Sequence, residues 1–226
     1  MTQLSHLKIK HSKRARRMAL RLDPVERVFH LVVPRGISEK RALAFAQQHD
    51  AWMQERLSAL PPPVRLEGGA VITLLGNRVT IKIHHVPDLH VTKIALEDSI
   101  LHVRSNKDDP SARISRFLKN FAKDELTVLA HEKAARIGKT VQSISVRDTK
   151  SRWGSCSHDG NLSFSWRLIF APPEAFDYVV AHEVAHLRHL DHSKAFWTLC
   201  RDLSDNFVEG QYWMRNHGNE LMRYGG

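Results

Sequence analysis

The sequence predicts an α+β chain with two subdomains, and three observations lead to this fold class. Segments in which apolar and polar residues alternate dominate the first part of the chain, as expected of half-buried strands. A long stretch of helical periodicity follows residue 110, and short strands and apolar helical segments come after it. The polar segment RSNKDDPSAR is the expected linker. We therefore expect a β-rich N-terminal subdomain with one helix over residues 1–105, and a second domain over residues 106–226.

The N-terminal subdomain is expected to contain two strands, one helix and two hairpins. Residues 18–33 alternate around a turn at Asp23-Pro24, which predicts two short strands. Residues 39–60 carry apolar side chains at helical spacing, with Ser38 as the N-cap and three prolines directly after the last turn. The hairpins are expected over residues 71–83, around Gly76-Asn77, and over residues 93–103, around Asp98-Ser99.

The second domain is expected to begin with one long amphipathic helix over residues 111–136. Two strands, within residues 141–157 and 160–166, should follow it. A helix is predicted to start after Pro172-Pro173, since proline is favoured in a first helical turn. The strand GNLSFSW, residues 160–166, is also a candidate exposed edge for an extended peptide, with an ordinary core strand as the alternative.

Charge is distributed unevenly along the chain. The net charge is +10, yet residues 174–226 carry −3, so residues 1–173 carry +13. Residues 1–21 hold seven Lys or Arg and no acidic residue. A basic N-terminal half predicts contact with nucleic acid or another polyanion. The alternative is a solvated basic strand edge that deters aggregation.

Hydropathy and cysteine content indicate the cellular compartment in which the protein is expected. No apolar run approaches the roughly 18 residues of a membrane span, and no apolar segment follows the basic N-terminus as in a secretory signal. Two cysteines indicate no disulfide framework. We therefore expect a cytoplasmic protein without a membrane span. The sequence does not define its oligomeric state.

Four histidines lie close together in VVAHEVAHLRHLDHSKAFW, residues 179–197. His182 and His186 are four residues apart, so on a helix they share one face, with Glu183 between them. HExxH on a helix is typical of metalloproteases in which both histidines bind zinc and the glutamate is a general base. The alternative is a buried histidine pair held by hydrogen bonds. The apolar flanks favour a buried helix, in which such polar groups rarely lack a role.

A catalytic zinc takes three protein ligands, so a third is expected from His189 or His192. On a straight helix His189 would lie roughly 10 Å along the axis from His182. Ligands that bond at about 2.0 to 2.1 Å cannot be so far apart. The helix must therefore end before the third ligand. His192 precedes Ser193, a plausible N-cap for a new helix, and is the predicted third ligand.

Three segments resemble the YgjP-like metallopeptidases, relatives of the SprT-like and WLM zinc proteases. They are SRWGSCS (151–157), AHEVAHLRHLDHSKAFW (181–197), and VPRGIS (33–38) followed by a helix with Trp52. The resemblance implies a zincin-like metallopeptidase domain: a long helix, a small sheet, the HExxH helix and a following helix. It also implies Zn²⁺ bound by His182, His186 and His192, with Glu183 as general base. The SprT-like and WLM branches are associated with DNA-linked protein substrates.

These observations predict a zinc-dependent metallohydrolase. The first interpretation is a metallopeptidase that cleaves a peptide or protein substrate by Glu-assisted attack of zinc-bound water. One alternative is a nucleotide pyrophosphatase or other phosphohydrolase, and another is a DNA-associated basic binding protein with a structural zinc. The segment RWGSC is a candidate for shaping the entrance of the site, although packing is the preferred role for Trp153 and Cys156. Arg147, Lys150 and Arg152 are candidates for holding phosphate; Arg152, Tyr178, Tyr212 and His217 are unranked candidates for stabilising an oxyanion.

Overall fold

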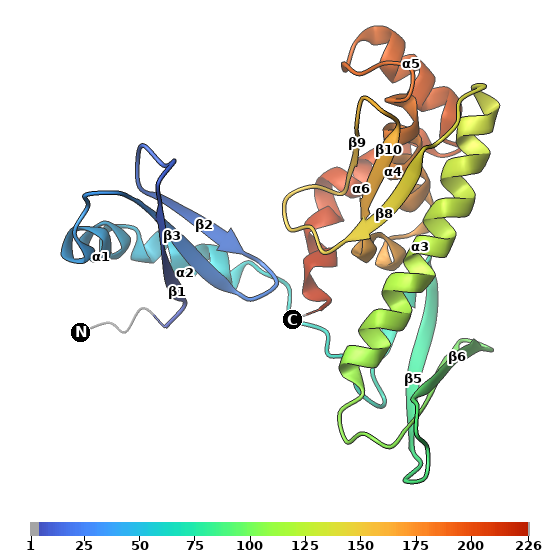
Figure 1. The fold of residues 1–226 in the computed structure, drawn as a ribbon, viewed down its shortest axis with the longest axis horizontal. Helices are drawn as coiled ribbons and strands as arrows, with labels where there is room; N and C mark the ends of the chain where they lie inside the picture. The colour runs from blue at the N-terminus through green and yellow to red at the C-terminus, as the bar shows by residue number, and fades with distance from the viewer. Residues whose placement is uncertain (1–4, 226) are drawn as a thin grey trace. The chain divides into compact units, whose positions relative to one another are not determined.

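The computed structural model describes residues 5–225 and divides them after Pro63 into two compact units (Figure 1). We call residues 5–63 the N-terminal unit and residues 64–225 the C-terminal unit. The sequence analysis grouped residues 64–105 with the N-terminal subdomain, whereas in the structure they belong to the C-terminal unit. The reason is burial: strand residues such as Ile81 and Leu101 share one hydrophobic core with the long helix that follows them.

The N-terminal unit is a three-stranded sheet with two helices. The strand order is β1-β3-β2, in which β1 is parallel and β2 antiparallel to the central β3. Alternate residues of β3, Phe29, Leu31 and Val33, are buried in one core with residues of both helices. The elements are β1 (Leu7–Ser12), β2 (Ala19–Asp23), β3 (Val28–Pro34), α1 (Glu39–Gln48) and α2 (Asp50–Ser58).

The two predicted strands of this unit are confirmed as β2 and β3, and Ser38 is confirmed as the N-cap of α1. The backbone N–H of Arg41 donates to Ser38 Oγ over 3.4 Å. Strand β1 was not predicted. The single helix predicted over residues 39–60 is divided at His49, which ends α1 and precedes α2. No proline or glycine marks that division in the sequence.

The C-terminal unit begins with a four-stranded sheet of order β4-β5-β7-β6. Both predicted hairpins are confirmed, since β4 pairs antiparallel with β5 and β6 with β7. Their turns require left-handed backbone: φ is 46° at Leu75 and 83° at Gly76 in the first, and 46° at Asp98 and 61° at Ser99 in the second. The strands are β4 (Val71–Leu74), β5 (Asn77–His85), β6 (Lys93–Glu97) and β7 (Ile100–Ser105).

Helix α3 (Ser111–Arg136) has the bounds that the sequence predicted and runs along the C-terminal unit (Figure 1). Ile114, Leu118 and Ala122 repeat at intervals of four residues and are fully buried. Near its C-terminal end, the buried Lys133 forms an ion pair with Asp177 and donates to the carbonyl of Leu203 over 2.6 Å. This contact ties α3 to the helices that follow.

A second sheet of order β8-β10-β9 lies beside α3 (Figure 1). Its strands are β8 (Ser143–Arg147), β9 (Gly154–Cys156) and β10 (Asn161–Ser165). Of the two alternatives for GNLSFSW, the core strand is confirmed and the exposed edge is not, because β10 pairs with β8 on one side and β9 on the other. Residues 148–153 leave the sheet as a loop, and β9 then returns to occupy the free side of β10.

The remaining elements are mainly helical and pack around the predicted HExxH helix α4. In residues 5–225, no helix is both long and apolar enough to span a bilayer. The elements are the 3-10 helix η1 (Trp166–Phe170), α4 (Pro173–Ala185), α5 (Lys194–Leu203), α6 (Phe207–His217) and the 3-10 helix η2 (Gly218–Arg223).

Candidate metal centre

Helix α4 carries the HExxH motif through the core of the C-terminal unit. Pro173 occupies its first turn, and most of its later residues are buried. His182 and His186 lie one turn apart, with ring centroids separated by 5.1 Å. Glu183 lies between them, and only 6% of it is exposed. The helix therefore presents two partly buried imidazoles and a buried carboxyl group.

The chain turns immediately after the motif, as the predicted distance between the histidines required. Helix α4 ends at Ala185, and Ser193 caps the new helix α5 by accepting from the Phe196 N–H over 3.4 Å. His192, directly before this cap, has its Nε2 atom 3.2 Å from Nε2 of His182. His182, His186 and His192 each offer a ligand atom, and these three atoms lie within 4.8 Å of one another.

The ring of His189 is not part of this group, but its main chain contributes to it. The His189 carbonyl oxygen lies 2.9 Å from Nδ1 of His186. Because a carbonyl oxygen only accepts, Nδ1 must carry the proton, which leaves the lone pair of His186 on Nε2. Such a hydrogen bond fixes both the tautomer and the orientation of a metal-binding imidazole.

The electrostatics of the cluster suit a divalent metal ion. Burial, together with the neighbouring His186 and His192, lowers the pKa of His182 to about 4. Burial also lowers the pKa of His186. Both rings are therefore neutral near pH 7, which is the form that binds metal. Two nitrogens that bind one tetrahedral ion at about 2.05 Å lie about 3.3 Å apart, close to the separation between His182 and His192.

Glu183 packs directly against strand β9. A Cβ atom built at Gly154 would lie within 2.6 Å of the Glu183 Cδ atom, so the carboxyl group occupies the space that any other residue would fill. Burial raises the pKa of Glu183 to about 8, although the positive charge of Arg152 opposes this shift. Sequence reasoning did not single out Gly154. A glycine inside a short strand is the signal that marks such a close approach.

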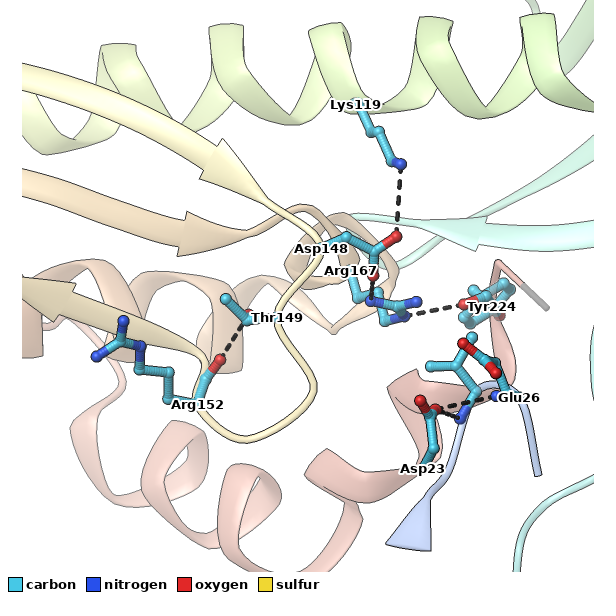
Figure 2. A network of polar contacts seen from close by, with 9 residues as sticks. Asp23, Glu26, Lys119, Asp148, Thr149, Arg152, Arg167 and Tyr224 are labelled. Carbon is cyan, nitrogen blue, oxygen red and sulfur yellow. Dashed lines mark hydrogen bonds and ion pairs between the residues drawn. The ribbon is translucent and has the colours of Figure 1, made fainter. Parts of the chain in front are cut away.

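A network of polar contacts anchors the loop that leads into β9 (Figure 2). The fully buried Arg167 donates through Nη1 to Asp148 over 2.5 Å and through Nε to the Tyr224 carbonyl over 2.9 Å. Lys119 of α3 lies 3.5 Å from the other oxygen of Asp148. At the far end of the loop, the Thr149 hydroxyl donates to the Arg152 carbonyl over 2.8 Å. The loop is therefore held at its start by Asp148 and near its end by Arg152, the residue directly before Trp153.

A cavity of about 330 Å³ opens beside His182 and Glu183. Helix α6, which the sequence analysis did not predict, forms one of its walls. Gly210 permits this, since a Cβ atom there would lie 2.6 Å from the Cβ of Tyr178 on α4. The cavity is lined by Trp153, Gly154, Tyr178, Val179, His182, Glu183, Gln211, Met214 and Arg215.

Of the other residues that the sequence offered for oxyanion stabilisation, Tyr178 lies at the cavity and Tyr212 and His217 are not among the residues that line it. Tyr178 lines the cavity, while the ring nitrogen Nδ1 of His217 lies 2.8 Å from Glu220 and Tyr212 is 65% exposed. Cys156 packs against the main core, and burial and the nearby Glu183 raise its thiol pKa to about 11. A thiol with such a pKa is a poor nucleophile at neutral pH, in keeping with the expected packing role.

Comparison with known proteins supports the assignment of a family. The model of the YgjP-like metallopeptidase domain matches residues 16–217, which include most of each unit and every element from β2 to α6. Searches of the curated proteins and of the solved structures find no match to the chain. The family match covers most of the sequence and agrees with the resemblance carried by its three short motifs. The chain belongs to the YgjP-like metallopeptidase family.

Proposed function

We propose that the protein is a zinc-dependent peptidase in which His182, His186 and His192 hold Zn²⁺ and Glu183 is the general base. The observation that carries this proposal is the convergence of three imidazoles beside a buried carboxyl group at the edge of a cavity. Neutral nitrogen donors suit Zn²⁺, and three protein ligands leave one position open for water or substrate.

When bound, Zn²⁺ supplies a Lewis acid that makes water a nucleophile near neutral pH and polarises the substrate carbonyl. Glu183 accepts the proton of the attacking water and passes it to the leaving amine. A nearby dication favours the ionised carboxylate and so opposes the effect of burial on the pKa of Glu183. These two influences leave the group able both to accept and to return a proton.

Two features near Glu183 suit a peptide substrate. Strand β9 is the edge of its sheet next to α4, so an extended peptide that pairs with Gly154–Cys156 would lie alongside the motif. The cavity has apolar walls from Trp153, Val179 and Met214, which suit an apolar side chain of the substrate. Tyr178 lines the same cavity and carries a hydroxyl that is able to donate to the substrate carbonyl oxygen.

The test compares zinc content and peptide hydrolysis in the wild type, His192→Ala, His189→Ala and Glu183→Gln. We expect one zinc per chain in all but His192→Ala. His189→Ala is the matched control, because it keeps the main-chain carbonyl that accepts from His186. Glu183→Gln should retain zinc but lose about 10²- to 10⁴-fold in rate, the usual contribution of a general base.

Peptides and nucleoside triphosphates are assayed side by side with the same four proteins. Hydrolysis of triphosphates but not peptides would replace the proposed peptidase with a phosphohydrolase. Loss of zinc in His189→Ala alone would show that the third ligand is wrongly assigned. Peptide hydrolysis that survives Glu183→Gln would exclude this residue as the base.

A further inference from the structure

Positive charge is concentrated in the N-terminal unit rather than around the candidate metal centre. Residues 1–63 contain twelve Lys or Arg and five Asp or Glu, a net charge of +7. Residues 64–226 contain 22 Lys or Arg and 19 Asp or Glu, a net charge of only +3. The first 63 residues therefore carry most of the excess charge in little more than a quarter of the chain.

The sheet of this unit separates apolar from charged side chains by face. Leu7 and Ile9 of β1 pack with the buried residues of β3 in the core that includes α1 and α2. Because side chains alternate along a strand, Lys8 and Lys10 project from the opposite face. Arg21 of β2 and His30 of β3 also belong to that face, since both alternate with core residues.

The strand register places basic side chains next to one another. Lys8 and Arg21 each lie directly opposite His30, on either side of the central strand. Lys8 is offset by Glu26, which lies 2.6 Å away. For Lys10 and Arg21, no ion pair is found within residues 5–225.

A groove of about 530 Å³ lies along this face. The Ser12 hydroxyl accepts from the N–H groups of Arg14 and Ala15, over 3.3 and 3.2 Å, and so turns the loop that carries Arg14. Of the described residues that line the groove, none is a carboxylate. They are Lys10, Ser12, Arg14, Ala15, Arg21, His30 and Val32.

Two acidic residues of the unit lie near this face, since Glu26 pairs with Lys8 and an Asp23 oxygen lies 3.7 Å from Nε2 of His30. Asp23 accepts from the N–H groups of Val25 and Glu26 in the turn after β2 (Figure 2). Glu39, Asp50 and Glu55 belong to the helices α1 and α2. The lining of the groove itself carries three exposed cations, Lys10, Arg14 and Arg21, and no carboxylate among the described residues.

We propose that this groove binds the phosphate backbone of nucleic acid without sequence preference. Its cations come from β1, the following loop and β2, so the groove offers several separate positive charges, which suits a repeating anion better than a single ion. Guanidinium groups, two of which line the groove, match phosphate oxygens in geometry. No Phe, Trp or Tyr is among its lining residues, which favours contact with phosphates over stacking on bases. The proposal does not depend on the metal centre.

The test measures binding of the full-length protein to a labelled DNA duplex of about 20 base pairs and mixed sequence across a salt series. The groove variant is Lys10→Gln/Arg14→Gln/Arg21→Gln. If each residue neutralises one phosphate, the slope of log K against log salt becomes less negative by about 2 to 3, and affinity at 0.1 M salt falls by about 10²-fold. Glu183→Gln should bind as the wild type does.

The matched control is Lys40→Gln/Arg41→Gln/Arg56→Gln, which removes the same charge from α1 and α2. We expect it to keep the wild-type slope, and circular dichroism checks that both triple variants are folded. Equal weakening by the two variants would overturn the groove as the site, as would absence of DNA binding at low salt. Equally tight binding to polyglutamate, with the same dependence on the groove residues, would overturn nucleic acid as the ligand.

Discussion

At the scale of single residues, Gly154 determines where the proposed base lies. Its missing side chain leaves the space that the Glu183 carboxyl group fills. Gly154→Ala should displace Glu183 and reduce peptide hydrolysis by about 10²-fold, the cost of a small misplacement of a catalytic group. Zinc content should stay unchanged, because the three histidines lie outside this contact. The rate of peptide hydrolysis and the zinc content are measured on the same preparation of each protein.

The control for this change is Ser155→Ala, since the adjacent strand residue points to the other face of the sheet. Loss of zinc together with activity in Gly154→Ala would mean that the substitution disrupts α4 as a whole. Unchanged activity would mean that the carboxyl group is not held by its contact with β9.

Residue-level reasoning predicted much of the candidate site from spacing alone. The pair His182 and His186 needs only the helical repeat to lie on one face, and the rise of the helix shows why His189 cannot join them. Gly154 of β9 and Gln211 of α6 reach the surroundings of Glu183 from other elements, so their proximity depends on tertiary packing. No local pattern in the sequence records such contacts.

At the scale of elements, periodic segments were predictable and interruptions were not. Helix α3 repeats its buried positions over 26 residues, so its bounds follow from the sequence. The helix over residues 39–60 divides at His49, where no proline or glycine stands. The order of β9 and β10 in the sheet was not predictable either. The loop over residues 148–153 brings β9 to the edge beside β10, and the alternation of residues along a strand contains no information about strand order.

That loop depends on one buried arginine, which leads to a prediction for the pH dependence of stability. Burial alone would raise the pKa of Asp148, but hydrogen bonding and charge from Arg167, with help from Lys119, lower it below the usual 3.8. A carboxyl group with a lowered pKa stabilises the folded state above its unfolded pKa, and this contribution disappears as pH falls through the folded pKa.

Asp148→Asn should therefore be less stable than the wild type at neutral pH. The difference in free energy of unfolding should shrink as pH falls below the unfolded pKa of Asp148, because the wild-type carboxyl group then also becomes neutral. Urea unfolding of both proteins from pH 7 to about pH 2 measures this difference in free energy of unfolding. A difference that stays constant over this range would show that the ion pair with Arg167 does not stabilise the fold.

At the scale of the whole molecule, each unit has its own hydrophobic core. Leu31 belongs to the core of the N-terminal unit and Leu118 to that of the C-terminal unit, and both are fully buried. The sequence analysis placed the boundary at residue 105 because strands dominate the chain up to that point. Whether strands β4–β7 pack with earlier or later residues depends on long-range contacts, which alternation does not encode.

Separate cores predict that the two units unfold in separate steps. A unit of about 60 residues buries a smaller share of its surface than one of about 160, so the N-terminal unit should unfold first. Leu31→Ala should destabilise the first step by about 2 to 5 kcal/mol and leave the second unchanged. Leu118→Ala, the matched control, should do the reverse. Calorimetry of the full-length protein distinguishes these outcomes, and a single transition shifted by both substitutions would show that the two cores unfold as one cooperative structure.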